Sequence, residues 1–341
     1  MVELRRHRWP LVLLTLLVSL TLVLTACAGT QEPAADQTSQ PPTATPEPEG
    51  PTDWELLVTA AADYLGTGRS PVMSPEDVYN NIVVGGDPNY LLVDIRKPEH
   101  YAAAHIQGAI NIPFGEIWQE AHLAKLPKDK KLVIICYSGH TASYAAMFYN
   151  LLGYEAYAMK FGMMGWSDDA AVVGKQPWNC KSAELPTEAG KVEAAATYEL
   201  PEIDVPGDDL ETVVRARAEA FLTSGKPVVM KAVDIYNNVV AAGDPNYFLL
   251  DIRAPEDYEK GHLAGAINIP FRKVADPDQL AKLPRDKKII VICYSGHTAS
   301  QTSMLLNMLG YDATTMAFGM LSWAPNQLSC EKPNYPTVKG E

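Results

Sequence analysis

The sequence predicts an α/β protein built from two tandem copies of one domain. Long stretches repeat at a fixed offset of 157 residues, as when GDPNYLLVD at 86–94 returns as GDPNYFLLD at 243–251. The period has the size of a domain, which indicates tandem domains rather than a solenoid. Within each copy, short apolar runs alternate with helical patterns. This alternation is typical of a small, mostly parallel sheet flanked by helices.

Apolar spacing predicts the individual elements of the first copy. Helices are expected over residues 55–65, 74–84, 98–104 and 142–152. Strands are expected at the short apolar runs over residues 90–95, 109–112, 132–136 and 156–159. Asp53 is the candidate N-cap of the first helix, and Gly153 is the candidate C-cap of the last. After Trp166 the register of the repeat shifts, because the first copy carries several extra residues.

Composition excludes several classes of protein. The 341 residues include 28 Lys and Arg against 41 Asp and Glu, which gives a formal net charge of −13. An acidic chain without a basic block is a poor nucleic-acid binder, because phosphate contacts supply most of that affinity. The chain has five cysteines and no C-x-x-C pair, which argues against a disulfide scaffold and a structural zinc site. We therefore expect neither a nucleic-acid partner nor a metal.

The N-terminal segment has the features of an export signal. Arg5, Arg6 and Arg8 precede an apolar run that ends in Leu-Thr-Ala, and Cys27 follows directly. This arrangement resembles a bacterial lipobox, which implies cleavage before Cys27 and a lipid on its sulfur. The alternative is an uncleaved membrane anchor, since the run is close to spanning length. We expect a lipid-anchored, extracytoplasmic protein of the cell envelope that is held at the membrane by its N-terminal lipid.

The remaining composition divides the chain. The segment after Cys27 is rich in Pro, Thr, Gln and acid and has almost no large apolar side chains. Such a segment cannot bury enough surface to offset its ordering entropy. The prediction is a signal peptide over 1–26, a disordered tether over 27–53, a first domain over 54–185, a linker over 186–208 and a second domain over 209–341.

A cysteine stands where the most apolar strand of each copy ends. A loop that enters a helix N-terminus aims backbone N–H groups and the positive end of the helix dipole at one point. Both favour thiolate over thiol, and the thiolate is the nucleophile. The candidate catalytic residues are Cys136 and Cys293. Their candidate loop residues are Tyr137, Ser138, Gly139, His140 and Thr141 in the first copy and Tyr294, Ser295, Gly296, His297 and Thr298 in the second.

Three motifs, present in the same order in both copies, resemble the rhodanese (sulfurtransferase) family. They are VDIRKPEHY with LDIRAPEDY, AHIQGAINIP with GHLAGAINIP, and CYSGHTA in both loops. The resemblance covers about 72–178 and 229–328. It implies two tandem rhodanese-like domains with an α/β fold, and a sulfurtransferase with two competent sites because both copies keep cysteine and loop.

The resemblance also implies a mechanism and its partners. The cysteine would take a sulfane sulfur from a small donor such as thiosulfate or a persulfide, and pass it to a thiol or a cyanide-like acceptor in a ping-pong reaction. A cysteine persulfide would be the intermediate, with no cofactor. By the family pattern, Asp94 with Arg96 and Asp251 with Arg253 form buried ion pairs that support the loops structurally.

The loops also depart from the family pattern. They hold no Arg or Lys, so His140 and His297 would be the only nearby cations, and only when protonated. This argues against thiosulfate as the preferred donor. Phe161 and Phe318 each precede a single glycine where the family commonly shows two, which suggests a reshaped pocket wall.

Two cysteines outside the loops leave three alternatives open. Cys180 and Cys330 lie near the ends of the two copies. They form a disulfide that clamps the domains, or one acts as a resolving thiol, or both are free buried thiols, because connectivity cannot be read from spacing. Two other functions stay open beside the enzyme: a binding or sulfur-carrier module without turnover, and a thiol redox protein at the cell surface.

Overall fold

The structure is a computed structural model that describes residues 50–175, 179–207, 209–325 and 332–340. The predicted signal peptide, Cys27 and all but the last residues of the predicted tether lie outside these ranges. The described chain begins in a helix whose N-cap is Thr52, not Asp53. The Thr52 hydroxyl accepts from the Glu55 N–H, and the Glu55 carboxylate accepts from the Thr52 N–H. Within the described ranges no helix is long and apolar enough to cross a membrane.

Each copy contains one five-stranded sheet in which every strand pair is parallel. The strand order in the first copy is β1-β5-β4-β2-β3. Its elements are α1 (Asp53–Gly66), β1 (Val72–Met73), α2 (Pro75–Asp77), a π-helix (Val78–Val84), β2 (Tyr90–Asp94), α3 (Pro98–Ala103), β3 (Ile110–Asn111), a 3-10 helix (Phe114–Glu116), α4 (Glu120–Leu123), β4 (Lys131–Ile135), α5 (His140–Leu151), β5 (Ala156–Met159), α6 (Gly162–Trp166) and α7 (Ala170–Val173).

The second copy repeats this topology in the order β6-β10-β9-β7-β8. Its elements are α8 (Leu210–Leu222), β6 (Val229–Met230), α9 (Ala232–Ile235), a π-helix (Tyr236–Val240), β7 (Tyr247–Asp251), α10 (Pro255–Lys260), β8 (Ile267–Asn268), a 3-10 helix (Phe271–Lys273), α11 (Pro277–Leu280), β9 (Lys288–Ile292), α12 (His297–Met308), β10 (Asp312–Met316) and α13 (Met320–Trp323). The predicted fold class is confirmed. A counterpart of α7 does not occur among the described residues of this copy.

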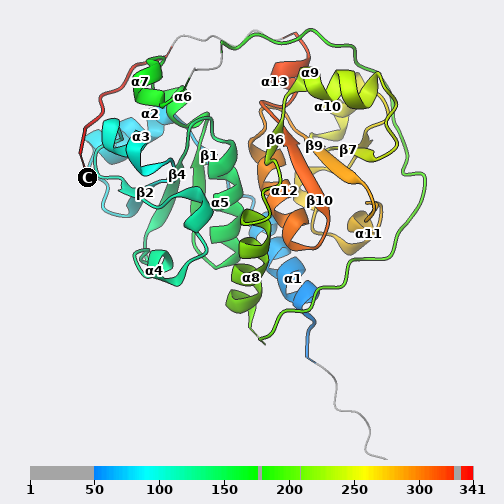
Figure 1. Ribbon diagram of the computed structural model, residues 1–341, viewed down its shortest axis with the longest axis horizontal. Helices are drawn as coiled ribbons and strands as arrows, with labels where there is room; N and C mark the ends of the chain where they lie inside the picture. The colour runs from blue at the N-terminus through cyan, green and yellow to red at the C-terminus, as the bar shows by residue number, and fades with distance from the viewer. Residues whose placement is uncertain (1–49, 176–178, 208, 326–331, 341) are drawn as a thin grey trace, which may run out of the picture. The chain divides into compact units, whose positions relative to one another are not determined.

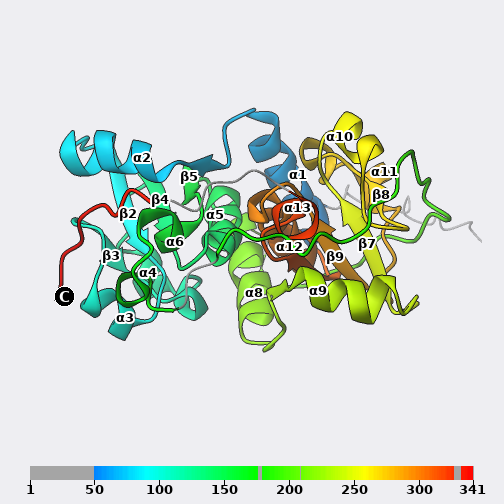
Figure 2. The same cartoon turned by 90° about the horizontal axis from the view of Figure 1, so that it is seen from above.

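The two copies share one hydrophobic core. Helices α5 and α12 lie side by side between the two sheets, with α1 and α8 packed along them (Figures 1 and 2). Polar contacts also cross the boundary: the Tyr64 hydroxyl donates to Gln301 Oε1 at 2.8 Å, and the Tyr144 hydroxyl donates to the Val228 carbonyl at 2.7 Å. Because α5 and α12 each begin at the end of a cysteine loop, their pairing brings the two loops toward the centre of the molecule.

The segment that follows each copy runs over the other copy. In Figure 1 the green chain after α7 passes along the second copy, and the red C-terminal segment lies on the first. Glu188 and His262 form an antiparallel bridge, as do His105 and Val338. The Trp323 indole N–H donates to the Pro186 carbonyl at 2.9 Å, and the Trp166 indole N–H donates to the Tyr335 carbonyl at 3.0 Å. These reciprocal contacts fasten the two copies together.

Candidate active site

Cys136 follows the last residue of β4 and is buried beneath its own loop. Its Sγ accepts a hydrogen bond from the Gly139 N–H at 3.0 Å. Gly139 has φ 84°, in the left-handed region that glycine adopts without a steric penalty, and α5 begins at the next residue. The same geometry recurs where the Gly296 N–H donates to Cys293 Sγ at 3.0 Å. In both copies the sulfur therefore faces a backbone donor at the N-terminus of a twelve-residue helix.

A second segment packs against each cysteine loop and forms the wall of the site, residues 161–164 in the first copy and 318–321 in the second. The Met163 N–H donates to the Cys136 carbonyl at 2.8 Å, and the Met164 N–H donates to the Tyr137 carbonyl at 2.9 Å. Gly162 lies directly against the Cys136 carbonyl, and a Cβ at this position would collide with that oxygen. The sequence places Phe161 before this glycine, where it adopts φ 60°. The second copy builds the same wall with Phe318, at φ 59°, followed by Gly319 and Met320.

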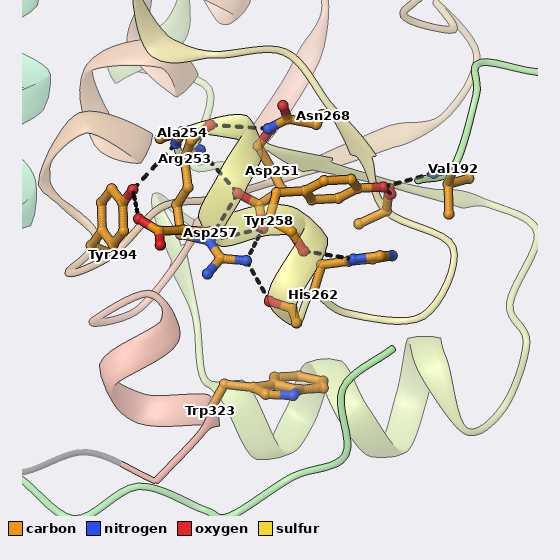
Figure 3. A network of polar contacts seen from close by, with 12 residues as sticks. Val192, Asp251, Arg253, Ala254, Asp257, Tyr258, His262, Asn268, Tyr294 and Trp323 are labelled. Carbon is orange, nitrogen blue, oxygen red and sulfur yellow. Dashed lines mark hydrogen bonds and ion pairs between the residues drawn. The ribbon is translucent and has the colours of Figure 1, made fainter. Parts of the chain in front are cut away.

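The acidic and basic residues of the first motif form buried ion pairs. Arg96 Nη2 lies 2.7 Å from Asp94 Oδ2, with both side chains fully buried, and Arg253 Nη2 lies 2.7 Å from Asp251 Oδ2. Figure 3 shows that Arg253 also reaches the backbone next to His262, where its Nη2 donates to the Gly261 carbonyl at 2.7 Å. Because these bonds satisfy the charged groups, the ion pairs support the loops structurally and do not take part in the chemistry.

The loop tyrosines lie at the outer side of each site. The Tyr137 hydroxyl lies 2.6 Å from His100 Nδ1, whereas the Tyr294 hydroxyl donates to Asp257 Oδ2 at 2.7 Å (Figure 3). Burial is the main cause that raises the pKa of both phenols, so both stay protonated at neutral pH. Ser138, Thr141, Ser295 and Thr298 are half-buried in the loops or on the first helical turn.

The loop histidines, which could serve as cations only when protonated, are held in the neutral form. Burial lowers the pKa of His140 and of His297 from an ordinary 6.5 to about 3. Nε2 of each ring accepts a backbone N–H, so each neutral ring carries its proton on Nδ1. Nδ1 of His140 lies 2.9 Å from Ser138 Oγ, and Nδ1 of His297 lies 2.9 Å from Ser295 Oγ. The histidines are therefore neutral acceptors at physiological pH.

Lys175 is a cation near Cys136 that the loop sequences do not reveal. It follows α7, within the extra residues of the first copy, and its Nζ lies 4.8 Å from the centre of the Tyr137 ring. The residue is exposed at the surface, but the ammonium end lies among protein groups. Burial there lowers its pKa, and the nearby Cys136 opposes that shift. Helix α7 is itself fixed to the site, because Arg96 Nη1 donates to the Val172 carbonyl at 3.0 Å.

The structure gives the bonding state of one of the two cysteines outside the loops. Cys136 and Cys293 are free thiols, whereas Cys180 is disulfide-bonded. The alternatives in which Cys180 is a free or a resolving thiol are therefore wrong for this state of the protein. Cys330 lies outside the described residues, so its pairing with Cys180 stays a prediction. No group of three or more His, Cys, Asp or Glu side chains within the described ranges is arranged to hold a metal ion.

Comparison with known families identifies the class of protein. The model of the rhodanese-like domain matches residues 74–169 and 236–326, together more than half of the chain. The two matched stretches contain β2 to β5 and β7 to β10, four of the five strands of each sheet, together with the two cysteine loops and the segments that pack against them. The chain belongs to the rhodanese-like domain family, with two tandem domains of that family.

Named relatives agree with this class. A protein of Mycolicibacterium smegmatis, provisionally named a thiosulfate sulfurtransferase, is 24% identical over 271 residues, which cover 67% of this chain and 87% of that protein. The thiosulfate sulfurtransferase PspE of Escherichia coli is 32% identical over 71 residues, 21% of this chain and 68% of that protein. A solved thiosulfate sulfurtransferase of Pseudomonas aeruginosa is 18% identical and covers 84% of this chain and 50% of its own, but the TM-score is 0.28. The assignment rests on the sequence matches, which support a sulfurtransferase-type enzyme.

Proposed function

We propose that this protein is a sulfurtransferase that carries sulfane sulfur as a persulfide on Cys136 and Cys293. The observation that carries the proposal is the buried thiol of each copy, whose Sγ accepts the N–H of a left-handed glycine at the start of a helix. A preorganised backbone donor stabilises negative charge on sulfur before any substrate arrives. The same cradle suits the terminal sulfur of a persulfide anion.

The reaction proceeds in two balanced half-reactions. The Cys136 thiolate attacks the outer sulfur of thiosulfate. A bond forms between Cys136 Sγ and that sulfur, the S–S bond of the donor breaks, and sulfite leaves with the electron pair. A thiolate or cyanide then attacks the terminal sulfur of the persulfide. The S–S bond to Cys136 breaks, the cysteine regains its thiolate, and the product is a new persulfide or thiocyanate. No outside oxidant is needed, which is the pattern of covalent ping-pong catalysis.

Lys175 supports an anionic donor at the first site. Its ammonium lies over Tyr137, the residue that follows Cys136, and a unit charge there attracts a dianion such as thiosulfate. The loop histidines are neutral and supply no such attraction. The loop residues alone disfavour thiosulfate, whereas the Lys175 ammonium favours it at Cys136.

The test is the direct capture of the persulfide. The chain without its first 27 residues is incubated with thiosulfate and, separately, with glutathione persulfide, and mass spectrometry is used to find a gain of one sulfur. A cyanide-labile gain on Cys136 and Cys293, absent from Cys136→Ser and Cys293→Ser at the substituted position, supports the proposal. A folded protein with alkylatable thiols that gains no sulfur from either donor would leave the non-turnover module as the better account. A mixed disulfide on an active cysteine would favour the redox protein.

We further propose that the chain is exported and anchored by a lipid on Cys27. The disulfide at Cys180 supports export, because stable disulfides belong to oxidising compartments. The test is fractionation of cells that express the full chain. Wild type is expected in the membrane fraction with a labelled fatty acid, and Cys27→Ser is expected without the label. A label that survives in Cys27→Ser would contradict the proposal.

A further inference from the structure

The two active-site loops contact each other at the centre of the molecule. The imidazole rings of His140 and His297 lie nearly parallel, with centroids 6.1 Å apart and an interplanar angle of 10°. Gly139 packs so closely on His297, and Gly296 on His140, that a Cβ on either glycine would collide with the ring. Both histidines are buried. The loops are therefore parts of one continuous centre rather than two separate sites.

Each histidine binds the backbone of the opposite copy. The Phe318 N–H donates to His140 Nε2 at 2.8 Å, and the Phe161 N–H donates to His297 Nε2 at 2.9 Å. The rings also meet edge to face, at 4.8 Å between the centroids of His140 and Phe318. Both bonds are partly buried, and a donor shielded from water loses free energy when its acceptor is removed, so these bonds are costly to break.

The backbone that each histidine holds is the wall of the other active site. Phe318 has φ 59°, a left-handed conformation that a bulky residue adopts only where its surroundings fix it. Gly319 follows against the Cys293 carbonyl, and the Met320 N–H donates to that carbonyl at 2.9 Å. A continuous path of contacts thus runs from His140 through Phe318 to the backbone of Cys293, and its counterpart runs from His297 to Cys136.

We propose that His140 and His297 are positioning residues that act across the two copies: His140 positions the loop of Cys293, and His297 positions the loop of Cys136. The inference rests on the proposed sulfur transfer, because it concerns the same two cysteines. The competing account is that each histidine serves only its own loop, through its bond to Ser138 or Ser295. The two accounts place the effect of one substitution on different cysteines.

The experiment uses the Cys136→Ser protein, in which sulfur can load only on Cys293. His140→Asn and His140→Gln are compared in this background. Asparagine carries its amide at the reach of Nδ1, so it loses the acceptor for the Phe318 N–H, whereas glutamine reaches the place of Nε2. His140→Asn is expected to slow sulfur loading of Cys293 about tenfold, the effect of one hydrogen bond shielded from water, and His140→Gln is expected to stay within about twofold of the parent.

A second measurement is independent of sulfur chemistry. The Gly296 amide donates to Cys293 Sγ, so its hydrogen exchange reports the closure of that loop. His140→Asn is expected to speed this exchange at least fivefold relative to His140→Gln. If the parent loads no sulfur, the proposed function fails, and the exchange still decides whether His140 positions the loop.

Two results would overturn the proposal. One is a folded His140→Asn protein in which loading of Cys293 and exchange of Gly296 match the parent. The other is unfolding of His140→Asn and of the reciprocal His297→Asn while both glutamine variants fold, which would assign the contacts to folding alone.

Discussion

At the scale of single residues, burial sets the protonation state of the two loop histidines. His140 and His297 are held neutral, since burial is the main cause that lowers each pKa to about 3. Lys175 adds to the shift at His140, and His140 and Lys160 add to it at His297. An unfolded histidine titrates near 6.5, so between these values the unfolded chain binds protons that the folded protein does not. Folding stability must therefore fall as the pH decreases through this window.

This linkage gives a pH prediction. Each histidine is expected to remove up to about 1.4 kcal/mol of unfolding free energy per pH unit below 6.5. Urea unfolding at pH 7 and pH 5 measures the loss. The double variant His140→Gln with His297→Gln, which does not titrate there, is expected to lose less stability than wild type over the same interval. An equal loss in both proteins would mean that the histidines are protonated in the folded state.

Lys175 provides a second prediction at this scale. In the Cys293→Ser protein, Lys175→Gln is expected to lower kcat/KM for thiosulfate about tenfold, because a nearby unit charge contributes about 1–2 kcal/mol to the binding of a dianion. Lys97→Gln is the matched control, since the Lys97 side chain is close in the chain to the site but 70% exposed. Steady-state kinetics with thiosulfate measures both variants. Equal kinetics for both would remove Lys175 from the donor site.

At the scale of elements, β4, the loop after it and helix α5 position the Cys136 thiol. Gly162 in the wall leaves room for the Cys136 carbonyl. Gly162 has φ 53° and lies against the Cys136 carbonyl, whereas Gly108 has φ 82° with open space around it. The two glycines therefore share a left-handed backbone and differ only in their neighbours. This separates the conformational cost of a Cβ from the steric one.

Gly162→Ala is expected to destabilise the protein by about 3 kcal/mol, because it combines a left-handed alanine with a collision at the Cys136 carbonyl. Gly108→Ala carries only the conformational cost, about 1 kcal/mol. Denaturant unfolding measures the stability of both variants. In Gly162→Ala, sulfur loading is expected to fall more at Cys136 than at Cys293. Equal destabilisation by the two substitutions would show that the wall yields to the added carbon.

Local sequence predicts what neighbouring residues build together. The run from Leu132 to Thr141 reads as strand, loop and helix because its periodicity, its glycine and its cysteine act within ten residues. The contact of His140 with Phe318 could not be predicted in this way, since it depends on how α5 and α12 pack across the copies. Lys175 was missed for a related reason: α7 brings it back to Tyr137 from outside the loop.

At the scale of the whole molecule, reciprocal exchange of the terminal segments joins the copies. The sequence held a signal for it, because LPT at 185–187 and YPT at 335–337 repeat at a new offset after the register shifts. Periodicity alone could not show that each segment lies on the other copy. The structure does so through the bridges of Glu188 with His262 and of Val338 with His105. The stability of one copy must then depend on residues that follow the other.

Removal of residues 332–341 tests this dependence. The His105 N–H donates to the Val338 carbonyl at 3.0 Å, and the Gly340 N–H donates to the Ala102 carbonyl at 3.0 Å, so truncation removes bonds from the first copy although the deleted residues follow the second. Hydrogen exchange of the His105 amide is expected to rise at least tenfold, because local opening no longer breaks a backbone bond.

The internal control is the equivalent amide of the second copy. The His262 N–H donates to the Glu188 carbonyl at 2.9 Å, and this bond stays intact in the truncated chain, so its exchange is expected to be unchanged. If the copies were independent domains with their own C-terminal segments, truncation would loosen 259–266 and spare 102–109. Faster exchange confined to 102–109 would show instead that each copy is completed by the chain of its neighbour. This is the same dependence that the crossed histidines create at the two active sites.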